Sequence, residues 1–167
     1  LGKFNSFLEE LAQDKNFRKV LRLKQSQEKD GTREECVLRF FAFLHRYKRF
    51  VHSVTEFLNE FMKDADANFD YAENERLFRK TFEQLGTVFP KGIVRAPGRN
   101  ITPINLYEGV SVGAALAIKK NGKIDTNKFA DWMKKSEELR QWTVAATNNR
   151  ASVVGRIETC KDRFLGD

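Results

Sequence analysis

The sequence contains few residues of the kinds that form metal centres and disulfide frameworks. Among its 167 residues there are two cysteines, Cys36 and Cys160, and two histidines, His45 and His52. A metal site needs convergent ligands, and a loop is expected to begin between the two histidines, so we expect exposed or partly exposed imidazoles and no bound metal. The cysteines fall on apolar helical stripes, where a free thiol behaves as a small hydrophobic side chain. We therefore expect neither a disulfide framework nor a catalytic thiol.

Long apolar runs and strand-like alternation are also missing. No segment approaches the roughly 20 consecutive apolar residues needed to span a bilayer. We accordingly expect no membrane partner and place the protein in the cytoplasm. Apolar and polar residues do not alternate with period two over any long stretch, which argues against a β-sheet.

Apolar residues instead recur at helical spacing along the chain. This pattern predicts an all-α fold, an irregular multi-helix bundle of about eight or nine helices. We expect residues 1–167 to form a single helical domain. The chain begins at Leu1, inside a helical pattern, which favours a fragment of a longer chain. Helix starts are predicted at Asp14, Thr32 with Glu35, Ser53 with Glu56, Thr102 with Pro103, Asp125 or Thr126, Ser136 and Asn149.

Glycines mark two expected helix ends and one expected helix contact. Gly86 is expected to close one helix, and Asn121-Gly122 the helix that follows it. Gly109 and Gly113 lie one turn apart and predict the close approach of another helix. Most of the 15 phenylalanines fall on helical faces, so we assign them to the core rather than to platforms for base stacking.

No catalytic arrangement can be recognised in the sequence. A phosphate-binding loop would read G-x-x-x-x-G-K-[ST], or G-x-G-x-x-G after a strand, and neither pattern occurs. Carboxylates fall at predicted helix N-termini or four residues from a basic residue, as Glu35 does with Arg39, which is typical of salt-bridged helix faces. We assign no catalytic residue, metal or cofactor to this chain and do not expect it to be an enzyme by itself.

Positive charge is the remaining functional signal. The chain has 30 Lys and Arg against 23 Asp and Glu, a formal net charge of +7, and basic surfaces bind phosphate backbones through counterion release. The loop from Pro90 to Asn100 ranks first because it presents its cations on a loop rather than on a salt-bridged helix. The end of the predicted helix near residues 46–49 ranks second. Cations at a helix C-terminus also stabilise the helix dipole, so their presence there has a structural explanation as well. The DNA-binding candidates are Lys91, Arg95 and Arg99 in the loop, and Arg46, Lys48 and Arg49 at the helix end.

Three segments together resemble a known family. They are residues 4–18, which contain FNSFLEELA and NFR, residues 35–47, which contain ECVLRFFAF and a tyrosine, and residues 56–62, EFLNEFM. This set resembles the helical second half of the N-terminal domain family of GmrSD restriction endonucleases. Residues 149–157, NRASVVGRI, are similar to the closing helix of that family. Within the shared run, we expect Arg39 to be buried or half-buried and paired with Glu35 rather than to contact a substrate.

The resemblance implies part of a prokaryotic DNA-targeting protein. Members of the family act in defence against foreign or modified DNA, often with nucleotide hydrolysis and an associated HNH-type nuclease. Their first half is ParB-like and carries a D-G-Q-Q-R-type motif, whereas residues 30–33 here read DGTR and lack the glutamines. The partners implied are therefore a missing N-terminal ParB-like domain, an HNH-type nuclease module and double-stranded DNA.

Two functional hypotheses follow. In the first, the chain is a helical accessory domain of a restriction or phage-defence protein, which supports the missing ParB-like catalytic half and contributes to a basic DNA-facing surface. In the second, it is a helical protein-interaction module with no direct DNA contact. A third hypothesis, a complete small enzyme, is the least favoured, because the sequence contains no recognisable arrangement of catalytic residues.

Overall fold

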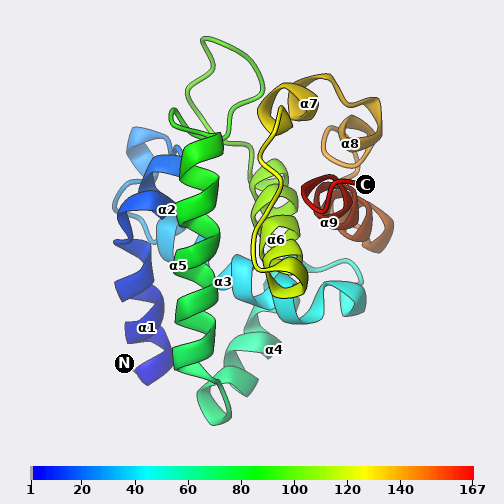
Figure 1. The fold of residues 1–167 in the computed structure, drawn as a ribbon. Coiled ribbons are helices and arrows are strands. Elements are labelled where there is room, and N and C mark those ends of the chain that lie inside the picture. The colour runs from blue at the N-terminus through cyan, green and yellow to red at the C-terminus, as the bar shows by residue number, and fades with distance from the viewer. Residues whose placement is uncertain (1) are drawn as a thin grey trace.

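The computed structural model describes residues 2–167, and this part of the chain forms helices and no β-strand (Figure 1). The predicted all-α multi-helix bundle is therefore confirmed. Within residues 2–167, two short 3₁₀ helices, η1 (Gln25–Gln27) and η2 (Tyr47–Arg49), flank the third of nine α-helices. The α-helices are α1 (Lys3–Ala12), α2 (Lys15–Val20), α3 (Thr32–Arg46), α4 (Val54–Ala67), α5 (Tyr71–Val88), α6 (Ile104–Asn121), α7 (Phe129–Lys135), α8 (Glu137–Gln141) and α9 (Arg150–Phe164). None of these helices is long and apolar enough to cross a membrane.

Several helix ends form as the sequence predicts. The side chains of Asp14, Ser53, Ser136 and Asn149 each accept a hydrogen bond from the backbone N–H three residues further along the chain. Such bonds satisfy donors that the first turn of a helix leaves without an intrahelical partner. Gly122 ends α6 in the left-handed conformation, with φ of 80°, which glycine adopts without steric penalty.

The predicted capping box at the start of α3 is wrong. Thr32 is the first helical residue, and Gly31 precedes it with φ of 89° and no side chain to cap the helix. The backbone N–H and the hydroxyl of Thr32 both donate to Asp30 Oδ1. Glu35 pairs instead with Arg39, whose Nε lies 3.1 Å from the carboxylate. The expected pairing of half-buried Arg39 with Glu35 is thereby confirmed.

The predicted start of α6 is misplaced because its capping residue serves a tertiary contact. Pro103, rather than Thr102, stands at the N-cap, and Ile104 is the first helical residue. The Thr102 hydroxyl accepts a hydrogen bond from the backbone N–H of Arg22 at 2.8 Å. The side chain expected to cap the helix thus links it to the segment that follows α2.

Two further predicted boundaries are wrong. Lys128, at φ of 57°, precedes α7 in place of Asp125 or Thr126. The fifth helix continues through Gly86 to Val88. A Cβ atom added at Gly86 would lie 3.2 Å from Oδ1 of Asn16 in α2. The glycine therefore accommodates the packing of α2 against α5 and does not end the helix.

Phenylalanine forms much of the core, as predicted. Of the 15 phenylalanines, all are buried except Phe57 and Phe69, which are partly buried and pack against the core. In Figure 1, α1, α2 and α5 lie on one side of the molecule and α6 and α9 on the other. Phe40 of α3 and Phe82 of α5 are in edge and tilted contact with other rings of this core. None of these rings is left exposed as a stacking platform.

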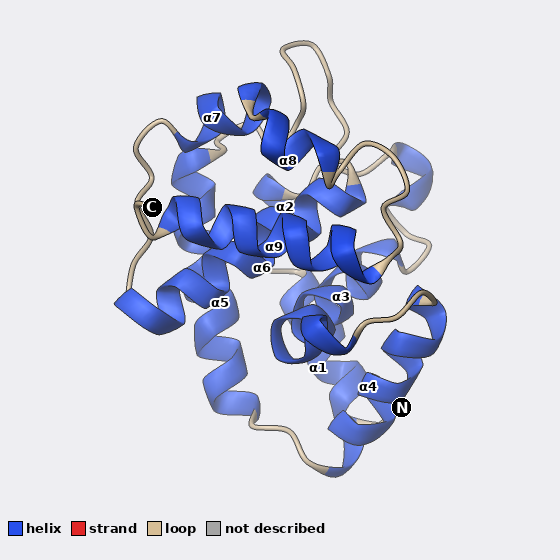
Figure 2. Cartoon of the chain, turned by 90° about the vertical axis from the view of Figure 1, so that its right-hand side faces the viewer, coloured by secondary structure: helices blue, strands red, loops and turns tan. Residues whose placement is uncertain are grey.

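The most extensive helix contact is between α6 and α9, which cross in Figure 2. A Cβ atom added at Gly109 would lie 3.1 Å from the Cβ and the carbonyl oxygen of Arg156. One added at Gly113 would lie 2.8 Å from Cys160 Cβ and from the backbone nitrogen of Lys161. The expectation that the two glycines admit another helix is confirmed.

We predict that Gly113→Ala lowers the free energy of unfolding by about 2 kcal/mol, because overpacking a backbone contact outweighs the gain in helix propensity. Gly86→Ala is the matched control, since its new methyl group meets a side chain that can move. Chemical denaturation of both variants measures the difference. A Gly113→Ala protein as stable as the parent would contradict the close approach.

Candidate nucleic-acid interface

The loop between α5 and α6 is closed at its base by backbone hydrogen bonds. Ile93 donates its N–H to the carbonyl of Val20 at 2.9 Å, and Thr102 donates to the carbonyl of Arg22 at 2.8 Å. At Gly92, with φ of +89°, an added Cβ would lie 2.2 Å from Arg22 Cγ. Both ends of the loop are therefore held against the segment after α2. Its middle extends beyond the helices at the top of Figures 1 and 2.

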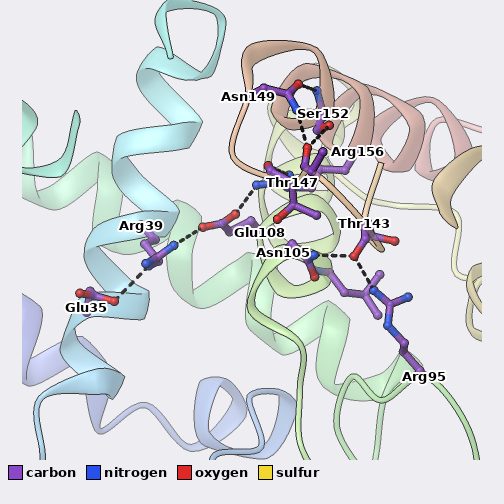
Figure 3. Close-up of polar contacts among 12 residues, drawn as sticks. Glu35, Arg39, Arg95, Asn105, Glu108, Thr143, Thr147, Asn149, Ser152 and Arg156 are labelled. Atoms are coloured by element: carbon purple, nitrogen blue, oxygen red, sulfur yellow. Dashed lines mark hydrogen bonds and ion pairs between the residues drawn. The ribbon is translucent and has the colours of Figure 1, made fainter. Parts of the chain in front are cut away.

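Arg95 connects this loop to the segment after α8. Its Nη2 donates to the carbonyl oxygen of Thr143 at 2.8 Å, and the Asn105 side chain donates to the same oxygen (Figure 3). Burial, and then the nearby Arg140, lower the pKa of Arg95. Arg95 is half-buried and holds the loop in place, whereas Lys91 and Arg99 are exposed.

A recess of about 520 Å³ lies beside the loop. Its lining includes three exposed cations, Lys91 and Arg99 from the loop and Lys134 from α7. The apolar part of the lining consists of Val88, Phe89, Pro90, Val94, Pro97 and Ala130, and Gly92, Gly98 and Asn100 complete it. The volume falls in the usual range of small-molecule sites.

A smaller hollow of about 30 Å³ shares Lys134 with the recess. It is also lined by the cations Arg95 and Arg140, and by the hydroxyl-bearing residues Ser136 and Thr143. We call Lys91, Arg95, Arg99, Lys134 and Arg140, which line the recess and the hollow, the basic face. Neither lining contains a carboxylate.

The second group of predicted DNA-binding residues lies elsewhere and is partly neutralised. Arg46 Nη2 is 2.8 Å from Asp64 Oδ2, and the guanidinium also covers the ring of Phe61. Arg46 and Arg49 line a different hollow, together with Glu60 and Asp64. Lys48 is exposed and lies near the Tyr47 ring. The structure therefore brings the loop cations together but does not bring this second group to the same face.

Sequence reasoning missed Lys134 and Arg140. Both lie on short helices, α7 and α8, and both have acidic neighbours in the sequence. That pattern is typical of solvated helix residues and did not indicate a binding role. Among the ion pairs of the described residues, none involves a member of the basic face. The signal that distinguishes them is their position across the loop, which only the fold supplies.

A second candidate site is the buried ion network at Glu108 (Figure 3). Arg156 Nη2 donates to Glu108 Oε1 and Arg39 Nη1 donates to Oε2, both at 2.7 Å. The other terminal nitrogen of Arg156 donates to the carbonyl of Thr147 at 2.7 Å. Glu108 and Arg156 are 2% and 1% exposed. Because both carboxylate oxygens are occupied by cations from two other helices, the network ties the fold together and offers no free base to a substrate.

The remaining candidate groups are not arranged for chemistry. Cys36 and Cys160 are free and buried, and burial raises the pKa of the Cys36 thiol to about 12 and that of Cys160 further. Among residues 2–167, no three His, Cys, Asp or Glu side chains are grouped to hold a metal ion. Nε2 of His45 lies 2.7 Å from the Asn74 side-chain oxygen. His45 is exposed at the surface, and partial desolvation of its ring by the residues packed around it lowers its pKa.

Comparison with protein-family models, with curated proteins and with solved structures gives no match. The resemblance to GmrSD endonucleases therefore stays a prediction. The geometry and charge of the sites themselves are the evidence that bears on function.

We predict that Glu108→Gln lowers the free energy of unfolding by about 3 kcal/mol, because removing the charge leaves the buried Arg156 guanidinium without a counter-ion and half-buried Arg39 with Glu35 alone. Glu73→Gln is the control, since Glu73 pairs with Arg76 on the surface, where such pairs contribute less than about 1 kcal/mol. Thermal and chemical denaturation measure both. Equal losses of stability in the two variants would contradict the structural role of Glu108.

Proposed function

We propose that the basic face binds the phosphate backbone of double-stranded DNA. The observation that carries this proposal is the clustering of five cations around two adjoining hollows whose linings contain no carboxylate. Three other hollows on the described surface each include at least one acidic residue. A polyanion is the ligand class that such a one-signed surface favours.

The geometry gives the cations two different tasks. Lys91, Arg99, Lys134 and Arg140 are exposed, so they can contact phosphates and release the counterions that DNA condenses. Arg95 holds the loop against Thr143, and its charge adds to the positive potential of the basic face. Because these contacts are electrostatic and not directed at base edges, binding is expected to depend strongly on salt and weakly on sequence.

The family resemblance supplies the setting of this proposal. The chain would act in the cytoplasm as a helical accessory domain of a prokaryotic restriction or phage-defence protein. A ParB-like half would supply catalysis, together with an HNH-type nuclease module. The chain itself would hold DNA and require no cofactor.

A second candidate function is protein interaction without DNA contact. One shallow hollow has Leu8, Leu38 and Met62 in its lining, together with Glu9, Glu34 and Glu35. An apolar surface with acidic neighbours is suited to a basic amphipathic segment of a partner, such as the ParB-like domain. This hollow lies in the α1–α3–α4 part of the fold, apart from the basic face.

The two functions predict different responses to loss of charge. The variant Lys91→Ala/Arg99→Ala/Lys134→Ala should bind a short DNA duplex more weakly, with the slope of log K against log salt reduced by up to about 2.7, or about 0.9 for each lost phosphate contact. Titration of the duplex at several salt concentrations, followed by fluorescence anisotropy, measures both quantities.

The control variant Lys48→Ala/Arg49→Ala/Lys120→Ala removes the same charge from exposed positions outside the basic face. It should retain most of the affinity and the salt slope. Equal effects of the two triple variants would mean that net charge alone attracts DNA. No binding of duplex DNA by the parent chain at low salt would overturn the proposal and favour the interaction module.

A further inference from the structure

We infer that the recess between the loop and α7 binds one unpaired nucleotide of a DNA strand, with its base against the apolar wall and its flanking phosphates on the basic face. This inference rests on the proposed function, because the same cations hold the strand. It adds a preference for DNA in which one base is out of the stack.

The size and lining of the recess favour a ligand that is partly apolar. Phosphate contact by itself needs only exposed cations, and a recess of about 520 Å³ is not required for it. Val88, Val94 and Ala130 are each partly buried in the recess lining. Apolar walls of this kind accept the face of a base, which loses little by leaving water.

Polar groups at the rim suit the edge and the backbone of a nucleotide. Asn100 carries an amide that both donates and accepts hydrogen bonds, as base edges require. Lys91, Arg99 and Lys134 are the only charged residues of the lining. Their shared sign favours phosphate groups beside the apolar wall.

The adjoining hollow distinguishes a nucleic-acid strand from a ligand with a single anionic head group. Arg95, Lys134 and Arg140 form a second cationic position that shares Lys134 with the recess. Two neighbouring cationic positions suit a polymer with repeated phosphates.

The loop is held in the way that such a recess requires. Its base is pinned to Val20 and Arg22, and Arg95 fixes its side to Thr143. Pro97 and Arg99 lie in the exposed part between these attachments. A wall that is already positioned does not have to be ordered on binding, which lowers the entropic penalty of burying a base.

The test uses the whole chain and three DNA probes. They are a short blunt duplex, the same duplex with one extra unpaired thymidine, and the same bulged duplex with an abasic residue in place of that thymidine. The thymidine bulge should bind about fivefold or more tighter than the blunt duplex, because the base buries apolar surface against the aliphatic wall. The abasic bulge has the same bend and phosphates but no base, so it should lose the gain.

A variant that fills the recess makes the test specific. Ala130→Leu should remove the preference for the thymidine bulge and leave affinity for the blunt duplex within about twofold, because the cations are unchanged and the filling side chain offers no aromatic face for stacking. Ala151→Leu, at an exposed position in α9, is the control and should keep the preference. Pro97→Leu, at an exposed loop position of the same lining, is the second filling variant if Ala130→Leu destabilises the fold.

Each outcome has a defined meaning. Equal binding of the blunt and bulged duplexes overturns the inference and leaves the proposed function standing, whereas failure of all three probes to bind overturns both. An equal gain for the thymidine and abasic bulges also overturns it, because DNA flexibility then explains the preference. Binding of phosphatidylglycerol vesicles that Ala130→Leu abolishes, without a preference among the DNA probes, would assign the recess to a lipid instead.

Discussion

The arrangement of α3, α6 and α9 depends on the two ion pairs of the buried Glu108 carboxylate. It lies inside the protein, with Arg39 of α3 on one oxygen and Arg156 of α9 on the other. A buried charge is strongly unfavourable without partners, so α3, α6 and α9 must take positions that bring both guanidinium groups to it. The glycines at positions 109 and 113 allow this, because they let α9 approach the backbone of α6.

The same network extends to the basic face. Arg156 also donates to the carbonyl of Thr147, and Arg95 and Asn105 donate to that of Thr143. These bonds attach the segment between α8 and α9 both to the core and to the loop after α5 (Figure 3). The basic face is therefore assembled from a loop and two short helices, and Asn105 of α6 and Arg156 of α9 hold the segment that follows α8.

Sequence reasoning succeeded where the physical cause is local. The caps at Asp14 and Ser136 and the left-handed Gly122 follow from a few neighbouring residues. It failed where a distant residue competes for the same group, as Arg22 does for the Thr102 hydroxyl. The grouping of Lys134 with Lys91 also depends on residues far apart in the sequence. Lys91 lies in the loop before α6 and Lys134 in α7 after it, and no sequence periodicity relates the two.

One missed feature did leave a signal in the sequence. Glu108 is the only charged residue between Ile104 and Ile118, in an otherwise apolar and glycine-containing helix. A lone carboxylate in such a segment predicts burial with a cationic partner. Its partners could not be chosen from the sequence, because many arginines are available and the packing of α6 against α9 decides which one reaches it.

The proposed binding of DNA by the basic face can be followed residue by residue in solution. An NMR titration of the labelled chain with a short DNA duplex maps which amide signals move. We expect the shifts to concentrate at residues 91–101 and 134–143, to weaken together as salt is raised, and to leave residues 46–49 nearly unchanged. Shifts centred on residues 46–49, or spread evenly over the surface, would contradict it.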